Sequence, residues 1–354
     1  MNTEYHIDDT FKIEWQKKIL RWYKFNKRDL PWRKKENQTF YRIWISEVML
    51  QQTQVSVAIP FYNKFLKKWP TLEIFFDASL DDILKMWQGM GYYKRAHNLF
   101  KAKEIIKKNP NFKININSLK KLPGIGDYIS SSILAILKDE QCAVVDGNIR
   151  RILTRVFNFK DKNKALNSRI HLVSSLLAPQ KHNGNYCQSL MDLANLICKV
   201  KNPICSSCPI LIECKTKGNN LKKNKKFEVK KKIAVTFILN IKGYFLVEKN
   251  KKDLLQNLFC SPMSNIVKYE DQLKLDKYLE KTVKEWMHKK NINTSYKLVG
   301  DIIHKFSHFH LKVMIVKLKL DSKFKYPSSF WLKKDEIDKK PISRLMEKVK
   351  AQIL

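Results

Sequence analysis

The first two hundred residues repeat their apolar positions with the period of a helix. Between residues 9 and 25, the apolar positions that share one helical face are Phe11, Trp15, Ile19 and Tyr23. Asp9 or Thr10 is placed to cap the start of that helix. The period continues to about residue 200, with short turns at residues 28–32, 89–91, 123–126 and 146–148. The pattern predicts a first domain, residues 1–216, that is mainly α-helical.

A lysine-rich stretch interrupts this pattern. Residues 217–231 offer almost no side chain that could be buried, and we interpret them as a linker between two domains. The runs that follow are β-branched and partly alternating, which predicts strands at 233–241, 243–248, 297–303 and 311–320. Helical patterns at about 270–289 and 342–353 accompany them. Residues 232–354 are therefore predicted to form an α+β domain.

Composition supports a folded protein that binds a polyanion. Hydrophobic residues make up 44% of the chain and charged residues 29%, which provides for a buried core and excludes wholesale disorder. A length of 354 residues fits two domains of ~150 residues each. The 69 lysines and arginines exceed the 33 acidic residues and give a net charge of +36. Such a charge favours nucleic acid as the partner.

The chain carries no signal for a membrane or for secretion. No apolar run approaches the ~18 residues of a membrane span. The first ten residues are acidic, where a secretory signal would be basic and then apolar. We therefore expect a soluble protein of the cytoplasm, associated with the nucleoid if the host is a bacterium. We also expect it to be a monomer.

Four of the seven cysteines lie within 17 residues of one another, at Cys198, Cys205, Cys208 and Cys214. In a reducing compartment such a group indicates a metal site rather than disulfides. Four thiolates can bind either one tetrahedral zinc ion or an iron–sulfur cluster, and the spacing leaves both open. The other three cysteines are predicted to be ordinary core residues, at Cys142, Cys187 and Cys260.

A turn rich in glycine and proline precedes a strongly apolar helical stretch. Residues 122–126 read LPGIG, and the helical period resumes over 128–137. Such a turn points backbone N–H groups outward at a helix start, where a DNA phosphate can bind without any base being read. A plain turn between two helices is the alternative. A short predicted helix at about 117–121 and the basic chain favour a helix-hairpin-helix motif.

Two carboxylates stand in unusual surroundings. Glu47 lies in an apolar helix, with Ile43 and Leu50 on its own face. Burial raises the pKa of a carboxyl group, which suits a general acid at neutral pH. The alternative is a surface glutamate, but the uncharged run that follows it, residues 51–53, argues against an exposed face. Asp146 lies in the turn VVDGN, where a simple helix cap would also explain it.

Taken in order, these motifs resemble those of the MutY-type adenine DNA glycosylases of the helix-hairpin-helix superfamily. The matching segments are RDLPWR at 28–33, WISEVMLQQTQV at 44–55, GMGYY at 89–93, LPGIG at 122–126, VDGNIR at 145–150, residues 191–214, and HKFSHFH at 304–310. Two residues are inserted between Arg33 and Glu47 relative to the family pattern, which lengthens a loop. The resemblance covers most of the chain.

The resemblance implies a helix-hairpin-helix glycosylase fold with a [4Fe–4S] cluster loop, followed by a Nudix-like α+β domain. It implies an enzyme that removes adenine mispaired with 8-oxoguanine or guanine in double-stranded DNA. The four grouped cysteines would then hold the cluster. Tyr128 stands where related endonuclease III enzymes carry a lyase lysine, so a monofunctional glycosylase is expected. An endonuclease III-type glycosylase/lyase and a non-catalytic iron–sulfur DNA-binding protein are the alternatives.

The resemblance also implies roles for single residues. Glu47 matches the catalytic acid and an ionised Asp146 the second carboxylate. The residues expected to line the adenine pocket are Arg28, Trp32, Leu50, Tyr128 and Asn148, with Asp192 as a further base contact. Those expected at the duplex are Gln52 and Tyr92 inside it, Thr53 and Met90 near 8-oxoguanine, and Gly124 and Gly126 at a phosphate. In the second domain, Phe306, Ser307 and His308 are expected to face the oxidised base. No acidic Nudix hydrolase signature is present, so pyrophosphohydrolase activity is not expected.

Overall fold

The computed structural model describes residues 7–160, 163–218, 229–251, 253–269, 275–323 and 328–353. The chain forms two compact units, the first from Met1–Asp77 and Asn98–Lys223 and the second from Ala78–His97 and Asn224–Leu354. The second unit thus includes a helical segment, 78–97, that the sequence pattern groups with the first domain. Most of the predicted linker, residues 219–228, lies outside the described residues.

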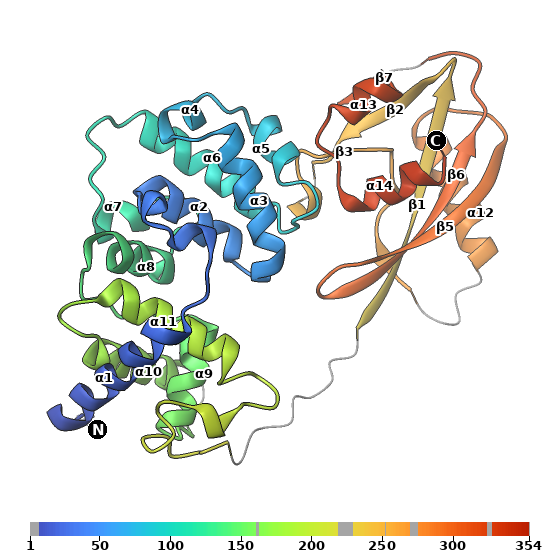
Figure 1. The fold of residues 1–354 in the computed structure, drawn as a ribbon. Helices are drawn as coiled ribbons and strands as arrows, with labels where there is room; N and C mark the ends of the chain where they lie inside the picture. Colours follow the sequence, from blue (N-terminus) through green and yellow to red (C-terminus); the bar gives the residue numbers. More distant parts are fainter. Residues whose placement is uncertain are drawn as a thin grey trace. The chain divides into compact units, whose positions relative to one another are not determined.

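The first unit is built from helices, in agreement with the predicted period (Figure 1). Its helices are α1 (Asp9–Asn26), α2 (Phe40–Leu50), α3 (Val55–Lys68), α4 (Leu72–Phe76), most of α6 (Lys94–Lys107), α7 (Ile116–Lys120), α8 (Asp127–Lys138), α9 (Gly147–Val156), α10 (Asn163–Leu177) and α11 (Asn183–Leu196). Short 3₁₀ turns lie at Pro31–Arg33, Lys35–Asn37 and Cys205–Ser207. The cap of α1 is Asp8, whose carboxylate accepts from the N–H groups of Thr10 and Phe11, rather than the predicted Asp9 or Thr10.

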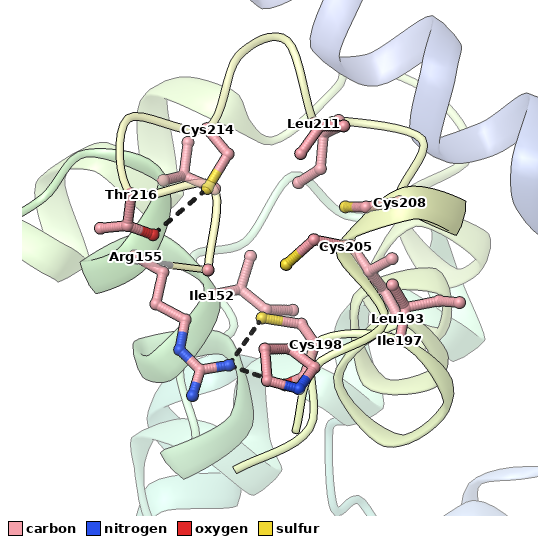
Figure 2. A pocket seen from close by; sticks show the side chains of 14 residues that line it. Ile152, Arg155, Leu193, Ile197, Cys198, Cys205, Cys208, Leu211, Cys214 and Thr216 are labelled. Carbon is pink, nitrogen blue, oxygen red and sulfur yellow. Dashed lines mark hydrogen bonds between the residues drawn. The ribbon is translucent and has the colours of Figure 1, made fainter. Parts of the chain in front are cut away.

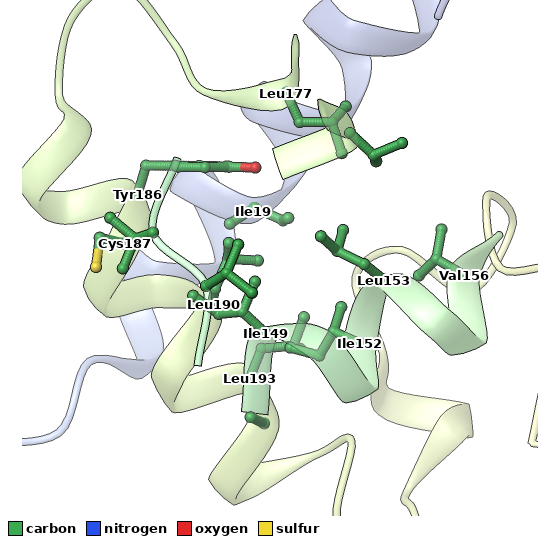
Figure 3. Packing of buried hydrophobic residues seen from close by; sticks show 14 of the residues in the cluster. Ile19, Ile149, Ile152, Leu153, Val156, Leu177, Tyr186, Cys187, Leu190 and Leu193 are labelled. Atoms are coloured by element: carbon green, nitrogen blue, oxygen red, sulfur yellow. The ribbon is translucent and has the colours of Figure 1, made fainter. Parts of the chain in front are cut away.

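Aliphatic side chains from α1, α9, α10 and α11 form a shared core in the first unit. Figure 3 shows Ile19, Leu153 and Leu190 among the side chains that meet there. The predicted face of α1 is largely confirmed, because Trp15, Ile19 and Tyr23 are buried. Trp15 also donates its indole N–H to the Tyr186 hydroxyl at 2.8 Å, which satisfies both buried polar groups.

The second unit contains a mixed sheet (Figure 1). Its strands are β1 (Lys230–Ile241), β2 (Tyr244–Lys249), β3 (Phe259–Cys260), β4 (Val267–Lys268), β5 (Tyr296–Lys305), β6 (Phe309–Leu318) and β7 (Ser329–Lys333). The main order is β3-β2-β1-β6-β5, with β1 and β6 parallel and the other pairs antiparallel. The four predicted strands correspond to β1, β2, β5 and β6; the sequence pattern misses the shorter β3, β4 and β7.

Helices α12 (Leu275–Lys289), α13 (Lys334–Asp338) and α14 (Arg344–Ala351) contact strands of this sheet. The second unit also contains α5 (Leu80–Met86). Phe237 of β1 stacks on Trp286 of α12 with ring centroids 4.1 Å apart, which fixes α12 against the sheet. The α+β class predicted for this region is confirmed. In the part of the chain that the structure describes, no helix is long and apolar enough to span a bilayer.

The segment 78–97 is held in the second unit by polar contacts. Asp81 pairs with Lys249 at 2.9 Å, and the Gln88 amide donates to Glu347 at 2.5 Å. The ammonium group of Lys85 donates to the carbonyl oxygens of Asp338 and Lys340 near the end of α13. These contacts place the GMGYY turn in the same unit as the β5–β6 hairpin.

Candidate active site and cysteine loop

Glu47 is buried in α2 with 8% of its surface exposed, which confirms that it does not lie on a solvated helix face. The Ser132 hydroxyl donates to Glu47 Oε1 at 3.0 Å, and the Tyr128 hydroxyl is a second hydrogen-bond partner. Burial raises the pKa of Glu47 to about 7, the hydrogen bonds and Arg33 oppose that shift, and the charge of Asp146 adds to it. A carboxyl group of this kind holds its proton near neutral pH.

Asp146 caps α9 and lies close enough to Glu47 for the two charges to interact. Its Oδ1 accepts from the backbone N–H groups of Asn148 and Ile149, both at 2.8 Å. Its Oδ2 accepts from the Asn148 side-chain amide at 2.8 Å. Burial raises the pKa of Asp146, and these three bonds oppose the rise because they favour the ionised form. Asp146 is therefore a true N-cap of α9, and the same hydrogen bonds hold its carboxyl group in place near Glu47.

Asp192 of α11 is fully buried and binds two arginines. Its oxygens accept from Arg28 Nε at 2.6 Å and from Arg33 Nη1 and Nη2 at 2.7 and 2.9 Å, with the Arg28 backbone N–H at 3.0 Å. Burial alone would raise the pKa of Asp192, but Arg33 and Arg28 hold it below its usual value. Four donors on two oxygens use the full acceptor capacity of a carboxylate. A base contact from Asp192 would require one of these bonds to break.

The other residues expected at the adenine pocket differ in burial. Trp32 is buried in the Pro31–Arg33 turn and meets Tyr62 edge to face with ring centroids 5.4 Å apart, which is the packing of a core aromatic. Leu50 is partly buried at the end of α2. Asn148 is partly buried in the first turn of α9, and its side-chain oxygen accepts from Arg151 Nη1 at 3.1 Å.

The two residues expected to enter the duplex share an unusual backbone conformation. Gln52 has φ of 55° and Tyr92 has φ of 49°, both in the left-handed region that non-glycine residues seldom adopt. Gln52 is exposed, and Tyr92 is 43% exposed, which excludes the alternative that Tyr92 is a core aromatic. Strained conformations of this kind concentrate at functional sites. Of their neighbours, Thr53 is partly buried and Met90 is buried.

The LPGIG turn joins α7 to α8 as the helix-hairpin-helix interpretation requires. Gly124 has φ of +82°, and a Cβ there would lie 2.9 Å from the Asn98 side chain, so glycine is needed on both counts. A Cβ at Gly126 would meet nothing within 4 Å. Gly126 precedes the first turn of α8, whose N–H groups have no partner within the helix.

The four grouped cysteines surround one small cavity. Figure 2 shows the sulfurs of Cys198, Cys205, Cys208 and Cys214 facing the same space, which the side chains of Ile152, Leu193 and Leu211 also line. Arg155 Nη1 lies 3.2 Å from Cys198 Sγ, and Thr216 Oγ1 lies 3.5 Å from Cys214 Sγ. A Cβ at Gly218 would lie 2.9 Å from Cys205 Sγ. Among the described residues, no three metal-binding side chains converge tightly enough to share one ion.

In the second unit, the β5–β6 hairpin carries Phe306, Ser307 and His308 at its turn. Ser307 and His308 are exposed, and Ser307 Oγ lies 3.2 Å from His308 Nδ1. Phe306 stacks on Phe309 at 4.6 Å, which fixes the turn to the strand that follows. A pocket of about 270 Å³ lies beside this turn, lined also by residues of the GMGYY segment. Tyr92 and Ser307 thus border one pocket of the second unit.

Sequence reasoning missed several residues of this site. Ser132 and Cys187 lie next to Glu47, and Arg151 and Arg155 join α9 to the cysteine loop through the Cys198 carbonyl oxygen at 2.9 and 3.3 Å. The run of three serines at 130–132 in an otherwise apolar helix is a signal that could have identified Ser132.

Comparison with known proteins agrees with this geometry. Residues 45–175 match the model of the HhH-GPD superfamily of base excision DNA repair proteins. The chain is 36% identical to the adenine DNA glycosylase of Buchnera aphidicola subsp. Schizaphis graminum over 85% of this chain and 86% of that protein. It is 33% identical to the human adenine DNA glycosylase over 56% of this chain and 38% of that protein.

Solved structures show the same fold in the helical region. A thermostable thymine-DNA glycosylase superposes with a TM-score of 0.54 and 22% identity, covering 59% of this chain and 98% of its own. An endonuclease III–DNA complex superposes with a TM-score of 0.51 and 17% identity, covering 62% and 100%. The sequence match to the Buchnera adenine DNA glycosylase covers 85% of this chain and 86% of that protein, and it decides the family. The chain belongs to the adenine DNA glycosylases of the HhH-GPD superfamily.

Proposed function

We propose that this chain hydrolyses the N-glycosidic bond of adenine mispaired with 8-oxoguanine or guanine in double-stranded DNA. The observation that carries the proposal is the pair formed by Glu47 and Asp146. One carboxyl group is buried with a pKa of about 7, and the other, next to it, is held by three hydrogen bonds that favour its ionised form. Two neighbouring carboxyl groups, one protonated and the other ionised, fit glycoside hydrolysis.

Glu47 acts first in the proposed mechanism. Adenine is a poor leaving group as an anion, so protonated Glu47 donates to N7 while the bond to C1′ breaks. General acid catalysis of this kind contributes roughly 10²–10⁴-fold. Ser132 and Tyr128 stabilise the carboxylate that forms, because each is a hydrogen-bond partner of it.

Asp146 acts on the sugar. Positive charge grows there as the bond breaks, and an ionised Asp146 stabilises it, either electrostatically or by brief covalent capture. Deprotonated Glu47 then activates water, following the logic of retaining glycosidases. Asn148 supports this step because its backbone and its side chain both donate to Asp146.

The adenine must leave the helix before any of this chemistry. Exposed Gln52 and Tyr92, both in left-handed conformations, are proposed to enter the duplex as the base leaves. Gly126 and the first turn of α8 are proposed to bind a phosphate. In the second domain, Ser307 beside the pocket of about 270 Å³ is proposed to contact 8-oxoguanine. The domain division at 1–216 and 232–354 and a monomeric state belong to the same proposal.

The four grouped cysteines are proposed to hold a [4Fe–4S] cluster. The shared cavity fits it, since each thiolate binds one iron of a cube, and the small Gly218 leaves Cys205 Sγ unobstructed. When bound, the cluster supplies Fe–thiolate bonds that cross-link the loop. Arg155 places positive charge beside Cys198 Sγ. The test is the brown absorbance near 400 nm expected of an iron–sulfur protein but not of zinc.

Strand cleavage by a lyase is not proposed. A phenol cannot form the Schiff base that a lyase requires, and burial raises the pKa of Tyr128 well above its ordinary value.

The decisive assay incubates the protein with duplexes carrying A·8-oxoguanine, A·G or A·T and cleaves abasic sites with alkali. Cleavage of the first two supports the proposal, and no cleavage overturns it in favour of a DNA-binding scaffold. A covalent adduct trapped by borohydride would favour the endonuclease III-type alternative, and loss of 8-oxoguanine preference in Ser307→Ala tests the second domain.

A further inference from the structure

Two buried polar side chains, Ser132 and Cys187, lie next to Glu47 on neighbouring helices. Ser132 of α8 is 1% exposed and donates to Glu47 Oε1 at 3.0 Å. Cys187 of α11 is 3% exposed and lies beside Ser132. In Figure 3, Cys187 lies at the edge of the aliphatic cluster, away from Leu153 and Val156. The thiol, the hydroxyl and the carboxyl group thus follow one another from α11 through α8 to α2.

The packing of α8 against α11 brings the Cys187 thiol, the Ser132 hydroxyl and the Glu47 carboxyl group together. Gly184 lies one turn before Cys187, and a Cβ there would be 3.0 Å from the carbonyl oxygen of Ala135. Ala135 in turn lies one turn after Ser132. The close approach of the two backbones brings Cys187 next to Ser132, and no side chain at position 184 keeps the helices apart.

We propose that Ser132 is a positioning residue that fixes and stabilises the proton-donating carboxyl group of Glu47, with Cys187 fixing the direction of the Ser132 hydroxyl. A serine hydroxyl has one hydrogen and two acceptor positions. Because Glu47 Oε1 takes the serine hydrogen, a hydrogen bond between Ser132 and the neutral thiol of Cys187 must have the thiol as donor and Ser132 Oγ as acceptor. Oε1 is then an acceptor before and after the proton leaves Glu47, and the bond strengthens once the carboxylate is charged.

Other groups also act on Glu47, and the test must separate them. Tyr128 shares α8 with Ser132, Asp146 precedes α9, Arg33 lies in the turn after α1, and Cys187 faces from α11. Ser130 provides a matched control. It is buried on the same helix, but its hydroxyl bonds the carbonyl oxygens of Gly126 and Asp127 rather than Glu47.

The first measurement rests on the proposed function. Single-turnover adenine release from an A·8-oxoguanine duplex is followed from pH 5.5 to 9. Because Ser132 stabilises the carboxylate, Ser132→Ala should move the alkaline midpoint upward by about 0.7 pH units and lower the acid plateau about fivefold, as expected for one hydrogen bond. DNA affinity should not change. The midpoint of Ser132→Cys should lie between those of the wild type and Ser132→Ala. Cys187→Ala should also shift the midpoint upward, and Ser130→Ala should match the wild type.

The second measurement needs no DNA and no activity. The pH dependence of urea unfolding is compared for the wild type and Glu47→Gln, and again for both in the Ser132→Ala background. The part of the pH dependence that Glu47 causes should extend to higher pH without Ser132. These four proteins form a double-mutant cycle, which gives the pH midpoint of the stability that Glu47 contributes. If that midpoint in the Ser132→Ala background lies within 0.2 pH units of the wild-type value, the proposal is overturned, even if adenine release is absent. A shift in the cycle without any adenine release would overturn the proposed function alone. An unshifted Cys187→Ala variant would refute the part assigned to the thiol.

Discussion

The carbonyl oxygen of Ala135 on α8 lies 3.0 Å from the place that a Cβ of Gly184 on α11 would take. The Cα of Ile136 lies equally close. Both neighbours are backbone atoms, so neither can rotate away. The helices that carry Tyr128 and Ser132 on one side, and Cys187 and Asp192 on the other, are thus in contact through their main chains.

Replacing Gly184 with alanine should therefore destabilise the protein. The added methyl must push α11 from α8, and overpacking of this kind costs about 1–3 kcal/mol. Urea unfolding should show the loss in free energy of unfolding. Gly126→Ala is the matched control, because its Cβ would meet nothing within 4 Å and its φ is not positive. Equal stability of Gly184→Ala and the wild type would contradict the close packing.

The same Gly126→Ala variant tests the helix-hairpin-helix turn. Gly126 is the N-cap of α8, where alanine is less favourable than glycine, so the variant should lose at most about 1 kcal/mol of stability. Its methyl group would lie where a phosphate approaches the backbone N–H groups. Affinity for duplex DNA should fall about tenfold at low salt, to a similar degree for matched and mismatched duplexes. Fluorescence anisotropy on both duplexes measures it. Unchanged affinity would show that the turn does not bind the DNA backbone.

Asp192→Asn should destabilise the protein strongly. The amide leaves Arg28 and Arg33 without their buried counter-charge, and breaking a buried pair in this way costs about 3–5 kcal/mol. Glu280→Gln serves as a control, since its pair with Lys284 is exposed and its loss should not be measurable. If Asp192→Asn keeps wild-type stability and loses only activity, Asp192 contacts the base rather than positioning the arginines.

How much of this site the sequence could predict depends on the range of each interaction. Glu47 could be identified locally, because the residues beside it on α2 are apolar or uncharged. The capping role of Asp146 is equally local, since its partners follow it within three residues. The arginine pairs of Asp192 could not be predicted from spacing, because they join residues 164 and 159 positions apart.

The fold divides in the same way. Helical period predicts α1 and α8, and β-branched runs predict β1 and β6, because each pattern reports one buried face. Strands of two residues, such as β3, are too short for a period. The grouping of 78–97 with the sheet was not predictable either, because an amphipathic helix does not encode which core it covers.

The pKa of Glu47 predicts how activity and stability each depend on pH. Only the protonated form can act as the acid, so adenine release should fall about tenfold per pH unit above pH 7. Glu47→Gln should lower release by roughly 10²–10⁴-fold at pH 6 while mismatch affinity stays. The exposed Glu73→Gln is the control for release and should match the wild type.

Stability should show the same pKa without any substrate. The folded protein holds the Glu47 proton more tightly than the unfolded chain, so this group contributes full stability below about pH 4.5 and loses it as the pH rises through about 7. The shift corresponds to about 3 kcal/mol for this buried group. Glu47→Gln has no proton to lose, so its free energy of unfolding should gain on the wild type by up to that amount between pH 5 and 8. Parallel pH curves for the two proteins would mean that Glu47 titrates normally, and the case for a buried general acid would then fail.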